Sequence, residues 1–382
     1  MRVFVTSSFG HWGAFSPGDL LDPNATGMIG GGETAMCHLA FQLARLGHDV
    51  KLFYDTPEPT RVAGVDVLPR ALQKPVLRDM YADVLLAWED LDSCSINHHC
   101  DLVVLPYQRN AMMLGTLAKS VDYVQAVSQW HRTTLKNSDP TFDLTGDAPG
   151  WIILPNGVDA ARYADRPDRT PLRVVYSSSP DRGLHHLLNI WPDVRKAVPG
   201  AELHVFYEVR RWIDLVRGIG PQTPVWPRME IVERALNDED STDIVFHGPV
   251  NQWALAQEHM KSSLLCYPCD TIDKATEGFG ITILEGLTAG IPVLTSDCDA
   301  FGELWADAAV QLPLPIETNY VGWVKEIKRL LTSERARKAA VKAGAARARD
   351  LTWDKVGDRY SDVLASLLDQ KRSGAPAGTL TY

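Results

Sequence analysis

Short apolar runs recur along the chain and alternate with longer stretches in which apolar residues return every three or four positions. The first pattern predicts buried β-strands and the second predicts amphipathic helices. The predicted strands occupy residues 2–6, 49–54, 84–87, 102–106 and 123–127, and then 173–177, 201–207, 244–246, 263–267 and 291–295. Strands that alternate with helices in this way predict an α/β fold with parallel sheets.

One interruption of this pattern divides the chain. Residues 160–171 are rich in charge and proline and predict a linker. We therefore expect Rossmann-like domains at 1–160 and 171–350, then a helix at 351–370 and a flexible tail at 371–382. Ligands of parallel α/β sheets bind beyond the C-terminal ends of the strands, so we expect two facing domains with the active site in the cleft between them.

Composition and charge narrow the function. The 382 residues carry a net charge of −10, which argues against nucleic-acid binding because phosphate affinity comes from accumulated Lys and Arg. No apolar run is long enough to span a membrane, and residues 1–5 enter a strand without a signal-peptide layout, so a cytoplasmic location is expected. Basic residues at 320–331 and 334–349 predict a solvated helix face, with peripheral contact to an anionic membrane as the alternative. The oligomeric state is left open.

The six cysteines are scattered, and reduced thiols are expected. Cys266 and Cys269 have C-x-x-C spacing, but they close an apolar strand instead of opening a helix as redox pairs do. A zinc site would need a second ligand pair, for which the run His98, His99, Cys100 is only a remote candidate.

The most informative stretch is residues 277–293, EGFGITILEGLTAGIPV. Glu277 precedes a Gly-Phe-Gly turn, and a helix is predicted from about Ile281, so backbone N–H groups and the helix N-terminus would form an anion site. A sugar nucleotide fits this arrangement, with Glu277 accepting from sugar hydroxyls, the turn holding the diphosphate, and Glu285 accepting from the ribose hydroxyls.

This stretch resembles the Glu-x7-Glu motif of retaining glycosyltransferases with the GT-B fold, of the family 4 type. The resemblance implies transfer of a sugar from a nucleoside-diphosphate donor with retention of configuration, in a front-face mechanism that needs no enzymic nucleophile. It assigns catalytic roles to Glu277 and Arg182. The donor-binding residues that it suggests near the motif are Gly278, Phe279, Gly280, Ile281, Thr282, Glu285 and Lys274.

Matches to the same family extend over nearly the whole chain. The run G-G-G-E, with Gly31 and Gly32 assigned to donor binding, resembles the family's first βαβ unit, and P-N-G-V-D at 155–159 resembles the end of its first domain. The helix after Leu351 resembles the closing segment that returns to the first domain. A dinucleotide fold is disfavoured, since the Gly-x-Gly-x-x-Gly fingerprint is absent and a long loop precedes the glycines.

Two departures from the family concern the chemistry. Of two cations that usually face the diphosphate, Arg182 matches the second, whereas serines including Ser178 replace the first, so Lys274 or Arg109 would have to compensate. His247 begins the segment that corresponds to the loop beside the nucleotide base in this family. A histidine that many relatives carry after the strand ending at Pro106 is missing, and His11, His98 and His99 are candidates by sequence proximity alone.

Metal and cofactor are not expected. Asp297 and Asp299 have the D-x-D spacing of metal-dependent glycosyltransferases of another fold, but they follow the strand after the glutamate motif, where helix capping or turn formation is the expected role. The acceptor is expected at the loop 7–17 and at Arg109. In that loop Phe9, His11 and Trp12 form either an open aromatic platform, which Gly10 and Gly13 favour, or a buried plug.

The predicted function is transfer of a sugar to a hydroxyl acceptor, which is a glycan, a glycolipid or a small natural product. The alternatives are a sugar-nucleotide epimerase on the same fold and a non-catalytic module that binds sugar nucleotides or glycans.

Overall fold

The computed structural model describes residues 1–8, 16–26, 30–140, 149–239, 241–272, 277–374 and 379–381. The chain forms two compact units, and each has its own sheet. The first unit combines Met1–Gly157 with Leu351–Tyr382, and the second is Val158–Asp350. The segment predicted as a linker, 160–171, therefore belongs to the second unit. None of the helices in these described ranges is long and apolar enough to cross a membrane.

The sheet of the first unit has nine strands among the described residues, in the order β15-β8-β7-β6-β5-β1-β2-β4-β3. Every pairing is parallel except that of β3 with β4. The strands are β1 (Arg2–Ser7), β2 (Asp49–Tyr54), β3 (Thr60–Val62), β4 (Val65–Pro69), β5 (Tyr81–Trp88), β6 (His99–Pro106), β7 (Tyr123–Ala126), β8 (Gly150–Ile153) and β15 (Thr379–Thr381).

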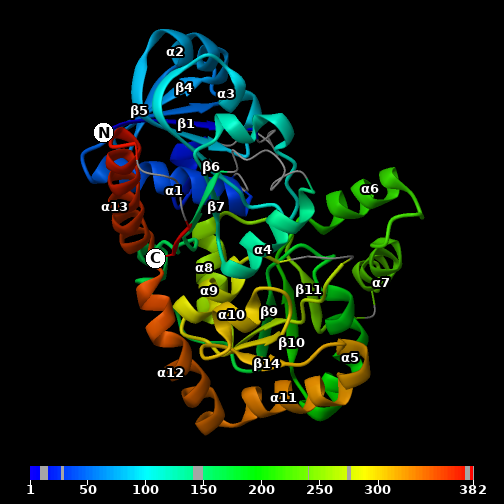
Figure 1. Ribbon diagram of the computed structural model, residues 1–382. Coiled ribbons are helices and arrows are strands. Elements are labelled where there is room, and N and C mark those ends of the chain that lie inside the picture. Colours follow the sequence, from blue (N-terminus) through cyan, green and yellow to red (C-terminus); the bar gives the residue numbers. More distant parts are fainter. Residues whose placement is uncertain are drawn as a thin grey trace. The chain divides into compact units, whose positions relative to one another are not determined.

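Successive side chains of β1 point to opposite faces of the sheet and contribute to two apolar cores. Val3 and Val5 pack on one side with helices α1 (Gly31–Arg45) and α13 (Trp353–Arg372), and Phe4 packs on the other. Figure 1 shows α13, in red, beside α1, in blue. The other helical segments of this unit are η1 (Pro17–Leu20), η2 (Arg70–Leu72), α2 (Gln73–Asp79), α3 (Leu91–Ser95), η3 (Gly115–Ser120) and α4 (Gln129–Ser138).

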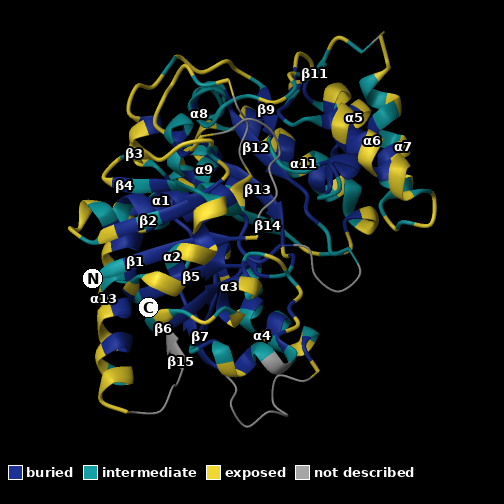
Figure 2. Cartoon of the chain, turned by 90° about the horizontal axis from the view of Figure 1, so that it is seen from above, coloured by how far each residue is buried: buried dark blue, intermediate teal, exposed yellow. Residues whose placement is uncertain are grey.

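Helix α13 completes the core of the first unit. Its apolar face, which includes Trp353, Tyr360 and Leu364, is buried, while its outer face is exposed (Figure 2). At Gly357 an added Cβ would lie 2.4 Å from the Cβ of Gln42, so the two helices approach closely there. The chain end differs from the expected flexible tail, because β15 adds to β8, whose backbone groups would otherwise be unpaired at a sheet edge.

The sheet of the second unit has six described strands, all parallel, in the order β11-β10-β9-β12-β13-β14. They are β9 (Arg173–Tyr176), β10 (Glu202–Val205), β11 (Ile244–Phe246), β12 (Leu264–Tyr267), β13 (Val293–Ser296) and β14 (Val310–Leu312). The chain adds β10 and β11 on one side of β9 and then continues on the other side with β12. This order places a topological switch point between β9 and β12, where α/β sheets bind ligands.

The helices of the second unit pack as two groups, α8 with α9 and α12, and α5 with α7 and α11. The helical segments are η4 (Ala160–Tyr163), α5 (Leu184–Ala197), α6 (Val209–Ile219), α7 (Trp226–Leu236), α8 (Gln252–Lys261), α9 (Ile281–Thr288), α10 (Phe301–Trp305), η5 (Ile316–Asn319), α11 (Tyr320–Thr332) and α12 (Glu334–Asp350). Helix α9 begins at Ile281, the residue that the sequence predicts.

Candidate functional site

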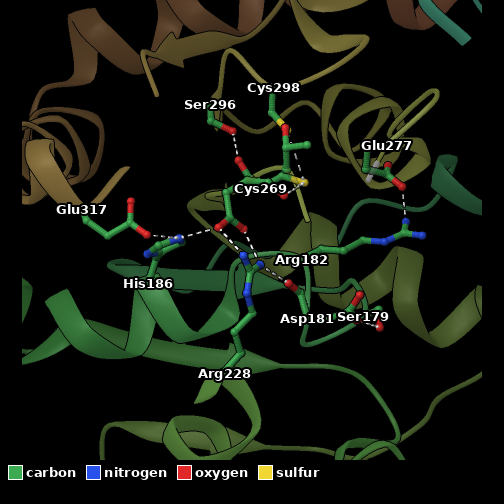
Figure 3. A network of polar contacts seen from close by, with 12 residues as sticks. Ser179, Asp181, Arg182, His186, Arg228, Cys269, Glu277, Ser296, Cys298 and Glu317 are labelled. Carbon is green, nitrogen blue, oxygen red and sulfur yellow. Dashed lines mark hydrogen bonds and ion pairs between the residues drawn. The ribbon is translucent and has the colours of Figure 1, made fainter. Parts of the chain in front are cut away.

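Two loops meet at the switch point of the second unit. The loop after β9 carries Arg182, the loop after β12 carries Glu277, and the Nη1 atom of Arg182 donates to Oε1 of Glu277 (Figure 3). The Glu277 side chain is 9% exposed, whereas the Arg182 side chain is 36% exposed. Burial raises the pKa of Glu277, and the charge of Arg182 opposes that rise. Two residues of the predicted site, 95 positions apart in the sequence, are therefore in direct contact.

The backbone of Glu277 is fixed by Asp299. The Glu277 N–H donates to Oδ2 of Asp299 at 2.9 Å, and the hydroxyl of Thr271 donates to Oδ1 at 2.8 Å. Asp299 itself has a positive φ of 51°. Both carboxylate oxygens of Asp299 thus hold residues of the loop after β12, while helix capping or turn formation by the two aspartates stays a prediction; Asp297 is exposed.

Two glycines let these loops approach their neighbours. Gly280, the N-cap of α9, has φ 80°, and a Cβ there would lie 2.6 Å from Cε1 of Phe301. Gly183, which precedes α5, has φ 94°, and a Cβ there would lie 1.7 Å from the carbonyl oxygen of Pro268. A residue with a Cβ would fit neither the positive φ nor the space available at these two positions.

The other residues of the glycine-rich turn have distinct environments. Phe279 is a core residue, because its ring meets Trp305 edge to face and its carbonyl accepts from Trp305 Nε1 at 2.7 Å. Thr282 is buried, and its hydroxyl lies 2.7 Å from that of Ser177. Gly278 lies in the turn, and Ile281 is the first residue of α9. Any contact of Phe279 with a ligand would therefore involve its backbone.

Glu285 lies one turn into α9 and is only partly exposed. Burial raises its pKa to about 7, although the charge of Arg162 opposes the rise. Arg162 and Tyr163 belong to η4, which begins after Asp159; the Asp159 carboxylate accepts from Ala161 N and pairs with Arg162. The sequence pattern predicted a linker here, so neither Arg162 nor Tyr163 was expected beside Glu285. Their position directly after the P-N-G-V-D motif was the available signal.

Ser178 and His247 lie near the same end of the second sheet. The Ser178 hydroxyl donates to the hydroxyl of Tyr267 at 3.2 Å. His247 follows β11, and its ring stacks on Phe206 with centroids 4.3 Å apart and lies 2.8 Å, nitrogen to nitrogen, from His204. These contacts hold the His247 ring in one orientation, which suits a position beside a nucleotide base.

Other predicted residues belong to the first unit. Gly31 and Gly32 are the first two residues of α1. The N-cap residue of this helix is Gly30, and its N–H donates to the side chain of Glu33. Arg109 forms an ion pair of 2.8 Å with Glu89, which also accepts from the backbone N–H of Arg109 at 3.1 Å. Phe9, His11, Trp12 and Lys274 lie outside the described residues. The roles of all these residues remain predictions.

Within the described ranges, one group of side chains has the spacing of metal ligands: His185, His186 and Asp270. Both oxygens of Asp270, however, accept from the guanidinium of Arg228, at 2.6 and 2.7 Å. The arginine therefore occupies the position that a cation would take.

Comparison with solved structures identifies the fold. The chain superposes on sucrose-phosphate synthase from Thermosynechococcus elongatus with a TM-score of 0.66 and 15% sequence identity, over 97% of this chain and 100% of that one. The fold is GT-B. This confirms the predicted fold class of two Rossmann-like domains in one α/β chain.

Sequence comparison relates the chain to transferases. Residues 225–347, which include Glu277 and Glu285, match the family Glycosyl transferases group 1. A phosphatidyl-myo-inositol mannosyltransferase of Mycolicibacterium smegmatis is 26% identical over 236 residues, 59% of this chain and 55% of the relative. A GDP-mannose-dependent alpha-(1-6)-phosphatidylinositol monomannoside mannosyltransferase of Mycobacterium tuberculosis is 27% identical over 218 residues, 52% of this chain and 50% of the relative. The alignments thus span about half of each relative, and together with the family match they support a transferase enzyme.

Proposed function

We propose that the protein is a retaining glycosyltransferase that moves a sugar from a nucleoside diphosphate to a hydroxyl acceptor. The observation that carries this proposal is the contact between Arg182 and Glu277 at the switch point of the second sheet, beside the N-terminus of α9. A guanidinium, a carboxylate and a helix N-terminus in one place suit a ligand that has both a diphosphate and hydroxyl groups.

Donor binding would exchange the partners of this ion pair. Arg182 keeps about a third of its side chain exposed and turns toward the diphosphate, and Glu277 then accepts from the hydroxyls of the sugar. Glu285, one turn into the helix, accepts from the ribose. The charge on the leaving diphosphate grows as the glycosidic bond breaks, so Arg182 stabilises the transition state more than the bound donor.

The relatives suggest which substrates to test first. Their names specify GDP-mannose as a donor and phosphatidylinositol derivatives as acceptors. We propose mannosyl transfer to a hydroxyl of a glycolipid as the first reaction to test, with uridine-diphosphate sugars as the comparison. No metal or cofactor is assigned to the reaction, because Asp299 of the D-x-D run is engaged by Glu277 N and Thr271.

One observation favours a second candidate, a module that binds sugar nucleotides without turnover. Arg182 is neutralised by Glu277, and serines take the place of a second cation. Such a module would bind the donor and release no nucleotide.

The test incubates the purified protein with guanosine- and uridine-diphosphate sugars labelled in the sugar, with and without phosphatidylinositol acceptors. Acceptor-dependent transfer by the wild type, lost in Glu277→Gln, supports the proposal, and the NMR coupling constant of the product reports its anomeric configuration. Isomerised donor without an acceptor would indicate an epimerase. Donor binding without any product would leave the non-catalytic module.

A further inference from the structure

Arg228 connects three segments of the second unit near Arg182. It lies in the first turn of α7, and its Nη1 atom donates both to Oδ1 of Asp270 and to the backbone carbonyl of Asp181, at 2.6 and 2.7 Å. Nη2 donates to Oδ2 of Asp270 at 2.7 Å. Figure 3 shows this guanidinium between the loop that carries Arg182 and the loop after β12. The bond to Asp181 therefore reaches the residue directly before Arg182.

The other end of this network is fixed in the interior. His186 lies 3.1 Å from Asp270, nitrogen to oxygen, and its second ring nitrogen lies 3.0 Å from the hydroxyl of Tyr320 in α11. The His186 side chain is 1% exposed, and the side chains of Arg228 and Asp270 are 15% and 13% exposed. Burial alone would raise the pKa of Asp270, but the hydrogen bond from His186 and the charge of Arg228 bring it below its ordinary value. Asp270 is thus an ionised anchor for Arg228.

Other contacts also hold the loop at 179–183. The Arg182 N–H donates to the Ser179 carbonyl at 3.0 Å, and the Ser179 hydroxyl donates to Oδ1 of Asp181. The hydroxyl of Tyr176 reaches the carbonyl oxygens of Ser179 and Arg182, at 2.7 and 3.1 Å. Gly183 lies against Pro268. Between these contacts, Asp181 accepts from Arg228 at its carbonyl. A charged donor to a partly buried carbonyl is among the stronger hydrogen bonds in proteins.

We infer that Arg228 is a positioning residue: anchored by Asp270, it holds the loop at Asp181 so that Arg182 faces the diphosphate of the donor. The inference rests on the proposed function and extends it to a side chain on a helix outside the glutamate motif. Arg228 itself touches no substrate in this account, since both ends of its guanidinium are engaged by Asp270 and Asp181.

The test is a double-mutant cycle between Arg228→Gln and Arg182→Ala, with kcat for sugar transfer as the readout. Misplacement of Arg182 should lower kcat by roughly tenfold to a hundredfold in Arg228→Gln, with little change in donor KM. In the Arg182→Ala background the same change should alter kcat by less than about twofold, because the group that it positions is gone. Multiplicative losses in the double variant would show that Arg228 acts independently of Arg182 and would overturn the inference.

Two further variants separate positioning from general stability. Arg234→Gln removes the same charge from an exposed position on the same helix and should leave kcat unchanged. Arg228→Lys keeps the charge but replaces the planar fork, whose two Nη atoms reach Asp181 and both oxygens of Asp270, with a single nitrogen, so it should restore only part of kcat. Full restoration by lysine would mean that charge alone suffices, which contradicts a role in holding the loop.

A measurement without turnover makes failure of this inference distinguishable from failure of the proposed function. Hydrogen exchange of the amides of Ser179, Asp181, Arg182 and Gly183 should be faster in Arg228→Gln than in the wild type and unchanged in Arg234→Gln. Unchanged exchange in Arg228→Gln overturns the inference whatever the activity. Absence of transfer by the wild type, with faster exchange in Arg228→Gln, rejects the proposed function and keeps the role of Arg228 in holding the loop.

Discussion

The raised pKa of Glu285 makes donor binding depend on pH near neutrality. Its pKa is raised to about 7 by burial, so the carboxyl is protonated in mildly acidic solution and ionised above neutrality. An ionised carboxylate accepts hydrogen bonds from both ribose hydroxyls, whereas the protonated form has lost part of that capacity. Donor affinity should therefore increase as the pH rises through about 7, and Glu285→Gln should abolish this dependence.

The magnitude follows from the titration. One unit below the pKa only about a tenth of the carboxyl is ionised, so the donor should bind about tenfold more weakly at pH 6 than on the alkaline plateau, a difference of about 1.4 kcal/mol. Calorimetric titration with GDP-mannose between pH 5.5 and 8.5 measures it. An intact sugar nucleotide is required, because the terminal phosphate of a free nucleoside diphosphate would itself titrate near 6, as phosphate monoesters do.

Stability should change with pH in the opposite sense. The pKa of this carboxyl is higher in the folded protein than its ordinary value of 4.5. Below pH 4.5 it is protonated in both states and does not lower the free energy of unfolding. As the pH rises from 4.5 toward 7, the unfolded state ionises first and the free energy of unfolding decreases. Without donor, Glu285→Gln should therefore be more stable than the wild type at pH 8, by at most about 3 kcal/mol. Glu334→Gln, an exposed change in α12, is the control for both assays. A flat wild-type binding profile, or the same slope in Glu285→Gln, would refute the assignment of Glu285 to the ribose.

Three other predictions concern the same unit. Arg182→Ala should lower kcat by roughly a hundredfold and donor affinity much less, which steady-state kinetics can measure; an effect confined to KM would contradict its role at the leaving group. Transfer should persist in EDTA, and loss of activity that manganese restores would show a metal requirement. Gly183→Ala should lower the melting temperature far more than Gly200→Ala, since both glycines have positive φ but only at Gly183 would the added Cβ clash with a carbonyl oxygen, 1.7 Å from that of Pro268; equal losses would show that this clash adds nothing.

The regular part of the fold was predictable because strands buried on both faces are continuous apolar runs. All ten strands predicted from such runs occur in the structure, and the two sheets follow from their alternation with helices. Five of the described strands were not predicted: β8, β14, β15 and the hairpin of β3 and β4. The hairpin was missed because its strands are short and partly exposed, and its turn is formed by Ala63 and Gly64, both with positive φ. Propensity gives little indication of an alanine in that conformation.

Sequence spacing alone defines the geometry of the candidate site only where its residues lie within one continuous motif, whereas Arg182 was assigned by resemblance to a family. Glu277, Gly280 and Glu285 share a turn and a helix, so sequence spacing defines their arrangement. Arg228 was not singled out, because its relation to Arg182 depends on the path of α7 and on a backbone carbonyl, which has no sequence signature. Side-chain contacts of this kind follow from tertiary packing and not from local pattern.

The return of α13 to the first unit has a consequence for how the protein is made. A ribosome synthesises Val158–Asp350 as one continuous segment, whereas the first unit must wait for Leu351–Tyr382 before its core is complete. During synthesis the apolar surface that α13 covers on α1 and the sheet stays open while the whole second unit emerges. That interval exposes the nascent chain to aggregation and to chaperones, and it means that expression of Met1–Gly157 alone would yield a fragment without the part of its core that α13 supplies.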